Sequence, residues 1–202
     1  MIVCVTGKMA AGKNAVAAIL EKNGFATVDA DTLVHKAIED ATKEIVNTFL
    51  PNARERGMEL LKANGTLDRR ALGVLVFGDK TLLAKQEAIV YPRVIELAEQ
   101  FIAEHKESAV ALNATALYKT PRLMQQCTAT LFVTAPYVKR LFRAKKRDGM
   151  PLCHIVARFR TQRMLYAKYC ATGIPVIKIN NSGSLKKLSA SVARALKKLE
   201  TT

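Results

Sequence analysis

Tryptophan is absent from this 202-residue chain, and other aromatic residues are few, with seven Phe and five Tyr. Proteins that bind single-stranded nucleic acid commonly stack the bases on aromatic side chains placed among basic ones. We find no basic patch that is interleaved with aromatic residues. The sequence therefore argues against a single-strand binding surface.

Long hydrophobic runs are also missing, because no stretch reaches the roughly 18 apolar residues that a membrane-spanning helix needs. The opening residues, "MIVCVTG", lack the basic segment, apolar segment and small-residue cleavage site of a secretory signal. We therefore expect a cytoplasmic protein that does not cross a membrane.

Cysteine is scarce, and the four present form no CxxC pair and no zinc-ligand spacing. Neither a zinc site nor a disulfide framework is indicated. Free cysteine usually behaves as a small apolar residue, so we expect buried or half-buried thiols. The four residues are Cys4, Cys127, Cys153 and Cys170.

Acidic residues are outnumbered, with 17 Asp and Glu against 32 Lys and Arg, which gives a formal net charge of +15. Such a surplus indicates a polyanionic partner. The partner could be nucleic acid, an acidic membrane surface or small substrates that carry several phosphates. Where the basic residues lie along the chain is the evidence that can separate these three kinds of partner.

A phosphate-binding motif stands near the start of the chain, in "TGKMAAGKN", residues 6–14. A P-loop reads G-x-x-x-x-G-K-[ST], with a final hydroxyl that ligates Mg²⁺. Gly7, Gly12 and Lys13 match this motif, whereas Asn14 replaces the Ser or Thr. An amide oxygen can also ligate Mg²⁺, directly or through water.

The context of the motif supports it. Residues 2–6 form a β-branched apolar run that predicts a buried strand. A helical pattern follows the glycines and ends at Gly24, and residues 25–28 predict a second strand. Strand, loop, helix and strand is the context that a P-loop requires.

The rest of the chain alternates between helical and strand patterns. Residues 32–105 are almost wholly helical in pattern. Pro51 and "ANG" at 63–65 are predicted to interrupt the helices. Strands are predicted at 109–113, 129–134 and 175–179. Helices are predicted in "YVKRLFRAKKRDG", which ends at Gly149, in "CHIVARFRTQRMLYAKY", and after an N-cap at Ser184. The pattern predicts an α/β fold with a doubly wound, five-stranded parallel sheet and a helical insertion.

Ligands of such sheets bind at the carboxyl ends of the strands, so the residues that follow each strand are candidates. Asp29 and Asp31 follow the second strand, where a carboxylate can hold Mg²⁺ or accept a proton from an attacking hydroxyl. Either residue could instead cap the next helix. Asn113 stands at the end of the third strand, where a motor ATPase would carry Asp, and this weakens an ATPase assignment more than a kinase assignment.

Arginines cluster after the fourth strand. Arg143 and Arg147 are spaced i, i+4, and Arg160 and Arg163 are spaced i, i+3. The two pairs flank Gly149 and could form a lid over phosphates, because phosphoryl transfer needs cations around the transferred group. The alternative is a solvated charged face, which we expect for most of the lysines.

These residues resemble a known family, the dephospho-coenzyme A kinases, over nearly the whole chain. "IVCVTGKMAAGK" is similar to the family's opening strand and P-loop, and "GFATVDADTLVHK" to its second strand. "NGTLDRRALGVLVFGD" is the most specific match, because it is long and belongs to no general phosphate-binding pattern. "APYVKRLFRAKKRDG" resembles its Arg-bearing helix, and "INNSGSLKKL" its closing turn.

The resemblance implies a P-loop nucleoside-monophosphate-kinase-like fold with three parts. Residues 1–31 and 106–202 would form the kinase core, residues 32–105 a helical insertion that binds coenzyme A, and residues of about 148–165 an Arg-rich lid. The implied reaction transfers the γ-phosphate of ATP to the 3′-hydroxyl of dephospho-CoA, with Mg²⁺, in the last step of coenzyme A biosynthesis.

The resemblance also implies site residues. Asp31 and Lys13 would be catalytic, and Asn14 and Asp31 would hold the metal. The dephospho-CoA contacts would be Asp29, Asp31, Arg69 and Tyr91. Arg70 is a further candidate from the same segment, and the alternative for Arg70 is an ion pair inside the insertion. The nucleotide contacts would be Lys8, Ala10, Ala11, Gly12, Lys13, Asn14, Ala15, Arg143, Arg160 and Arg163.

The chain departs from the family pattern at several of these positions. Asn14 replaces Ser or Thr, Tyr91 stands where the family often has His, and "NATALY" replaces its usual segment after the third strand. Two alternatives stay open: a P-loop kinase of another small acceptor, and a basic nucleic-acid-binding ATPase. We expect small-molecule substrates rather than nucleic acid, and we predict no oligomeric state.

Overall fold

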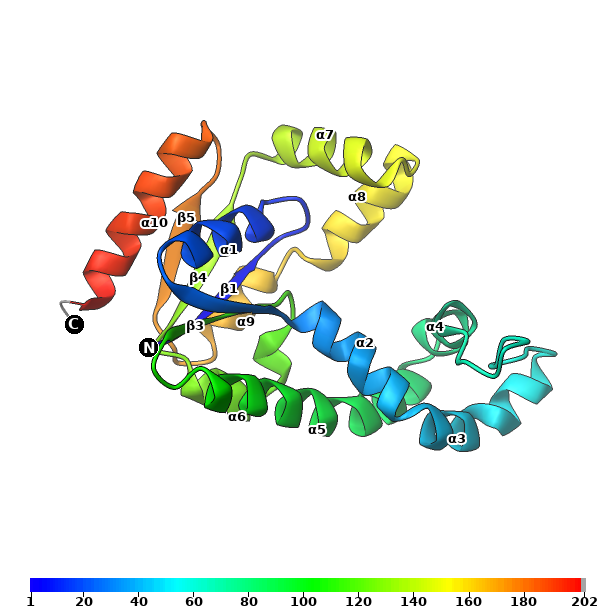
Figure 1. The fold of residues 1–202 in the computed structure, drawn as a ribbon. Helices are drawn as coiled ribbons and strands as arrows, with labels where there is room; N and C mark the ends of the chain where they lie inside the picture. The colour runs from blue at the N-terminus through cyan, green and yellow to red at the C-terminus, as the bar shows by residue number, and fades with distance from the viewer. Residues whose placement is uncertain (201–202) are drawn as a thin grey trace. The chain divides into compact units, whose positions relative to one another are not determined.

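The computed structural model describes residues 1–200, and Figure 1 shows their arrangement. Within these residues, five parallel strands form one sheet in the order β2-β3-β1-β4-β5, which confirms the predicted doubly wound α/β fold. The strands are rich in apolar and β-branched residues, as strands buried on both faces are. They are β1 (Ile2–Gly7), β2 (Phe25–Asp29), β3 (Ala109–Asn113), β4 (Ala129–Thr134) and β5 (Val176–Asn180).

Helices cover both faces of this sheet (Figure 1). Leu131 and Val133 of β4 join a core cluster that contains residues of α1 and α10. Phe132, between them, turns to the other face and packs its ring against Tyr169 of α9, with centroids 6.2 Å apart. The helices of this part are α1 (Lys13–Lys22), η1 (Leu117–Lys119), α6 (Pro121–Gln126), α7 (Tyr137–Asp148), α8 (Leu152–Thr161), α9 (Leu165–Cys170) and α10 (Leu185–Glu200).

The chain forms two compact units. One contains residues 1–30 and the chain from Phe101 onward, and the other contains residues 31–100. The second unit has its own apolar core, in which Ile45, Phe49 and Leu75 are fully buried. Its helices are α2 (Ala30–Asp40), α3 (Thr42–Glu55), α4 (Arg69–Phe77) and α5 (Lys80–Glu104), the first and last of which extend into the other unit.

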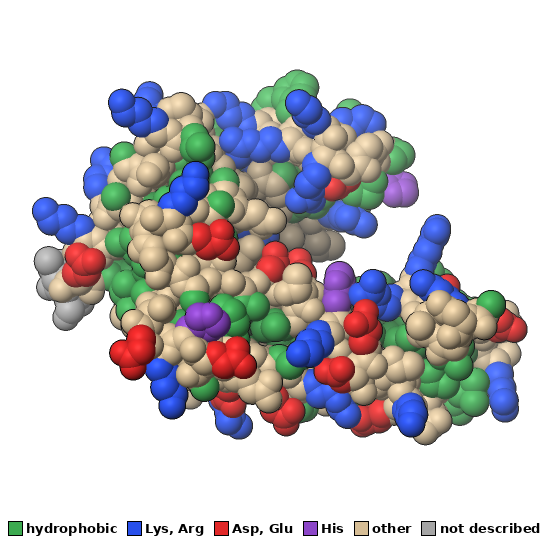
Figure 2. Space-filling view, in the orientation of Figure 1, with side chains coloured by type: hydrophobic (Ala, Val, Ile, Leu, Met, Phe, Trp, Pro, Cys, Tyr) green, Lys and Arg blue, Asp and Glu red, His purple; other side chains and the backbone are tan. Residues whose placement is uncertain are grey.

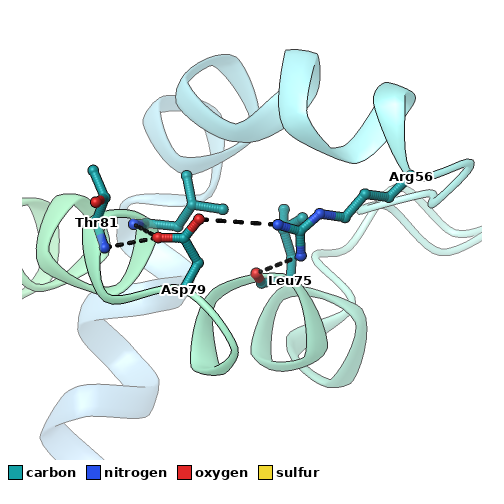
Figure 3. A network of polar contacts seen from close by, with 5 residues as sticks. Arg56, Leu75, Asp79 and Thr81 are labelled. Carbon is teal, nitrogen blue, oxygen red and sulfur yellow. Dashed lines mark hydrogen bonds and ion pairs between the residues drawn. The ribbon is translucent and has the colours of Figure 1, made fainter.

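Polar contacts fix the connections of the second unit, as Figure 3 shows. Arg56, which follows α3, donates from Nη1 to the carbonyl oxygen of Leu75 in α4 at 3.2 Å. Its Nη2 lies 4.0 Å from an oxygen of Asp79, whose other oxygen accepts from the backbone N–H of Thr81 at 2.8 Å. One arginine thus links the end of α3 to α4 and to the start of α5.

Two predicted helix ends are confirmed. Gly149 follows α7 in the left-handed conformation, with φ of 67°. Ser184 precedes α10, and its Oγ accepts from the backbone N–H of Lys187 at 3.4 Å. Gly149 suits its position because a left-handed residue without a Cβ carries no steric penalty.

The prediction of one helix over residues 153–169 was wrong, because the structure divides it into α8 and α9. Ile155 and Phe159 of α8 are buried with Ala144, whereas Leu165 and Tyr169 of α9 are buried elsewhere. The chain turns between the two helices, and each short helix buries its own apolar side chains.

The predicted helix boundaries in the insertion were also partly wrong. Pro51 does not end a helix but lies inside α3, and α5 begins at Lys80, well before Tyr91, with Pro92 inside it. Pro51 is half-buried, and its missing N–H removes one backbone hydrogen bond from this helix. The short helices η1 and α6 were not predicted.

Candidate active site

The glycine-rich loop between β1 and α1 requires glycine at two points. Gly12 is the N-cap of α1 with φ of 101°, and a Cβ there would lie 2.1 Å from Nδ2 of Asn181. A Cβ on Gly7 would lie 2.4 Å from the carbonyl oxygen of Val133. The loop therefore passes very close to β4 and to the turn after β5. It delivers the first backbone N–H groups of α1 to the sheet edge, where an anion can bind.

Two side chains hold the second half of this loop. Asn181 is buried and donates from Nδ2 to the carbonyl oxygen of Ala11 at 2.8 Å. Arg143 of α7 donates from Nη1 to the same carbonyl at 3.4 Å and from Nη2 to the carbonyl of Asn181 at 3.2 Å. Arg143, expected at the nucleotide, thus contacts the loop itself.

The first half of the loop is held at Met9. Its backbone N–H donates to Oε1 of Gln162 at 2.6 Å, and its carbonyl accepts from Nε of Arg140 at 2.9 Å. Arg140 is only 7% exposed, and its guanidinium lies 4.2 Å from the ring centroid of Phe159. Burial lowers the pKa of Arg140, because a low-dielectric environment disfavours the charged form.

Two cavities meet at Lys8 and Arg140. The larger, of about 540 Å³, brings together the predicted residues Lys8, Arg160 and Arg163 with Tyr137 and Phe159. The other, of about 260 Å³, is lined by Lys8, Lys178 of β5 and Tyr166, among others. Among described residues, no carboxylate lines either cavity, so both are suited to anions.

The other predicted lid arginine behaves differently. Arg147 is exposed and pairs with its neighbour Asp148, with Nε 2.7 Å from Oδ1. Figure 2 shows Lys and Arg side chains gathered over α7 and α10. On α7, the exposed basic residues match the charged face that the sequence left as an alternative. They are Lys139, Lys145, Lys146 and Arg147.

A polar cluster lies at the carboxyl ends of β2 and β3. Asp29 and Asn113 end these strands and are paired in register. Nδ2 of Asn113 donates to Oδ2 of Asp29 at 3.2 Å and to Oδ1 of Asn14, in the first turn of α1, at 3.1 Å. Lys13 is the first residue of α1. Asp31 lies in the first turn of α2, in the unit of residues 31–100.

The second unit contains a cavity of about 390 Å³ that is mostly lined by apolar side chains of α2, α4 and α5. Arg69 and Tyr91, the predicted acceptor contacts, both line it. The hydroxyl of Tyr91 donates to Oε1 of Glu87 at 3.2 Å, and Arg69 lies 3.6 Å from a carboxylate oxygen of Glu39. Arg69 thus makes an ion pair within this unit.

Comparison with known proteins identifies the family. A family model described as dephospho-CoA kinase matches residues 1–187. A dephospho-CoA kinase of Treponema denticola is 34% identical over an alignment of 202 positions, and the alignment covers 98% of this chain and 90% of that protein. The chain belongs to the dephospho-CoA kinase family. The resemblance inferred from the sequence is confirmed, and the chain is a kinase.

Solved structures agree with this assignment. The crystal structure of TT1252 from Thermus thermophilus has a TM-score of 0.80 at 30% identity and covers 98% of this chain and 97% of its own. A dephospho-CoA kinase from Campylobacter jejuni, 22% identical, has the same fold with a TM-score of 0.63 over 98% and 96%. Membership of the dephospho-CoA kinase family implies ATP as the phosphate donor. No helix in residues 1–200 is long and apolar enough to span a bilayer.

The donor atoms at the β2–β3 edge fit a hard cation. Asn14 and Asp29 each offer an oxygen, the ligand type that Mg²⁺ prefers. The described residues contain no group of three His, Cys, Asp or Glu side chains that could enclose a metal.

Sequence reasoning missed three residues that shape this dephospho-CoA kinase site: Arg140, Gln162 and Asn181. A signal existed for Arg140, which shares a helical stripe with the buried Ala144, one turn later. The other basic residues of this helix made the spacing of Arg140 and Ala144 difficult to recognise. Gln162 and Asn181 act on the loop across 153 and 170 positions of the chain, and no local pattern indicates such contacts.

Proposed function

We propose that this chain transfers the γ-phosphate of ATP to the 3′-hydroxyl of dephospho-CoA. The observation that carries the proposal is a phosphate-binding loop, held at Met9 and Ala11, beside a polar cluster at the same sheet edge. Donor phosphates and an attacking hydroxyl must meet in this way for in-line transfer.

On the donor side, the backbone N–H groups of residues 10–15 bind the phosphates, supported by the start of α1. Lys13 neutralises the β- and γ-phosphates as a point charge. Lys8, Arg160 and Arg163 supply further cations from the cavity of about 540 Å³. Arg143 secures the loop through Ala11 and is also assigned as a nucleotide contact.

For the metal, we propose Asn14 and Asp31 as protein ligands, with Asp29 as a third candidate because it shares a hydrogen-bond donor with Asn14. When bound, Mg²⁺ neutralises charge on the β- and γ-phosphates of ATP. Asn14 presents an amide oxygen where the usual motif presents a hydroxyl.

For the chemistry, Asp31 is the proposed base. The 3′-oxygen forms a bond to the γ-phosphorus while the bond to the β,γ-bridging oxygen breaks. The hydroxyl proton passes to the Asp31 carboxylate, and ADP departs with the bridging oxygen. Lys13 and the lid arginines stabilise the charge that develops on the transferred group.

For the acceptor, we assign residues 32–105 as the coenzyme A-binding insertion, residues 1–31 and 106–202 as the kinase core, and about 148–165 as the lid. The cavity of about 390 Å³ in the insertion suits the acceptor's pantetheine arm. That arm combines an apolar dimethyl group with amides, and the cavity combines apolar walls with Arg69, Gln86 and Tyr91. A cytoplasmic location and small-molecule substrates rather than nucleic acid stay predictions.

The test is ADP release from ATP and Mg²⁺ with a panel of acceptors: dephospho-CoA, a nucleoside monophosphate and shikimate. We expect release that requires dephospho-CoA and falls about 100-fold or more in Lys13→Ala and Asp31→Asn. Matched controls are Lys22→Ala and Asp40→Asn, exposed residues at the opposite ends of the same helices. Equal turnover of another acceptor, or full activity of Asp31→Asn, would contradict the proposal.

A further inference from the structure

Asn113 occupies an unusual position between two candidate metal ligands. It is only 4% exposed, and its Nδ2 donates to both Asn14 and Asp29. An amide nitrogen carries two hydrogens, and both are used here. Its Oδ1 is buried without a hydrogen-bond partner among the described residues. This side chain therefore keeps a costly unsatisfied atom while its donor end joins two oxygens.

The chemistry of the neighbours fixes the direction of this amide. A flip about the Cβ–Cγ axis would turn Oδ1 toward Oδ1 of Asn14 and Oδ2 of Asp29, placing three acceptor oxygens together. The strand register prevents a larger movement, because Asn113 is aligned with Val5 on one side and Asp29 on the other. Asn113 is thus held rigidly with its N–H groups toward the two oxygens.

We propose that Asn113 is a positioning residue for the metal–nucleotide complex, and that Asn14 and Asn113 work as a pair. The Nδ2 group sets the direction of the Asn14 and Asp29 oxygens, and oxygen is the ligand type that a divalent cation such as Mg²⁺ prefers. This inference rests on the proposed function, because the metal enters with ATP. Groups that orient metal ligands in this way typically affect metal affinity 10- to 100-fold.

The pairing also explains the amide at position 113. A carboxylate there would approach Asp29 at the distance of the present hydrogen bond, and the two like charges would repel. A neutral amide instead donates to Asp29. Asn14 then accepts the second N–H, a contact that the shorter side chain of serine would not make from the same position.

The experiment measures binding of a non-hydrolysable ATP analogue by calorimetry, without acceptor, in Mg²⁺ and in EDTA. Asn113→Leu removes the donor at similar volume. We expect it to weaken binding about 10-fold or more in Mg²⁺ and less than about 2-fold in EDTA. Thr130→Val is the matched control, since Thr130 is buried in β4 with an unpartnered Oγ1 away from the cluster. It should leave binding unchanged in both buffers.

A second variant covers the case in which Asn113→Leu fails to fold. Asn14 is exposed, so Asn14→Ser perturbs packing little while restoring the hydroxyl of the usual motif. We expect Mg²⁺-dependent binding to weaken rather than improve, and the two changes together to cost less than the sum of each alone.

Equal losses in Mg²⁺ and EDTA, no loss in either, or additive effects would overturn the inference. These measurements contain no acceptor. An absence of dephospho-CoA phosphorylation would therefore contradict the proposed function while leaving the assignment of Asn113 intact, and the reverse also holds.

Discussion

Replacing Gly12 with Ala should be among the most damaging single changes in the loop. Gly12 has φ of 101°, and its new Cβ would lie 2.1 Å from Nδ2 of Asn181. An L-residue in the left-handed region costs about 1–2 kcal/mol, and overpacking a buried site costs about 1–3 kcal/mol more. Asn181 could rotate away only by giving up its 2.8 Å hydrogen bond to Ala11. We therefore expect a loss of roughly 2–5 kcal/mol in the free energy of unfolding.

Gly24→Ala separates the two contributions. Gly24 also has a positive φ, of 84°, but a Cβ there would have no neighbour within 4 Å. Gly24→Ala should therefore lower the free energy of unfolding only by the cost of the left-handed backbone, about 1–2 kcal/mol. Urea unfolding followed by circular dichroism measures both variants, and calorimetry should find weaker ATP binding for Gly12→Ala alone. Equal destabilisation of the two variants would refute the close approach of Asn181 as the decisive factor.

Three further predictions concern other parts of the structure. Arg140→Met should lower the free energy of unfolding, measured in urea, by about 1.5–3 kcal/mol, the usual value of a hydrogen bond to a charged group. It should also raise the KM for ATP, because the carbonyl of Met9 loses its partner. An unchanged free energy of unfolding and an unchanged KM would contradict the role of this contact. The pKa of Asp68 is lowered chiefly by the backbone N–H of Ala71, so its stabilisation is present above pH 3.8 and is lost as the pH falls through the lowered pKa. Asp68→Ala should therefore lower the Tm at pH 7 but not in strong acid, and a difference that persists there would contradict this assignment. Burial raises the pKa of the Cys127 thiol to about 12, and Cys4 is also buried, so alkylation of the native protein followed by mass spectrometry should modify the exposed Cys153 and Cys170 and spare the other two until urea is added.

Local features of the sequence were sufficient for much of the fold. The apolar runs predicted all five strands found in residues 1–200, because strands buried on both faces need continuous apolar residues. Gly149 and Ser184 predicted the end of α7 and the start of α10, because cap preferences depend on a few neighbouring residues. The glycines and Lys13 predicted the phosphate loop for the same reason.

Partnerships between distant segments could not be predicted in this way. Arg140 and Arg147 belong to one basic run, yet one is buried against Phe159 and the other is exposed. Asn113 was noted as a missing Asp, but its bonds to Asn14 and Asp29 depend on the order of the strands. The division between α8 and α9 likewise depends on where each helix buries its apolar side.

The sequence by itself therefore determined the strands, the phosphate loop and the family, since each is encoded in residues that are close together or in a long characteristic match. Only the tertiary structure decided which basic and amide side chains reach the loop. Burial and hydrogen bonding select these residues from chemically similar neighbours, and both are properties of chain segments that lie as many as 170 positions apart.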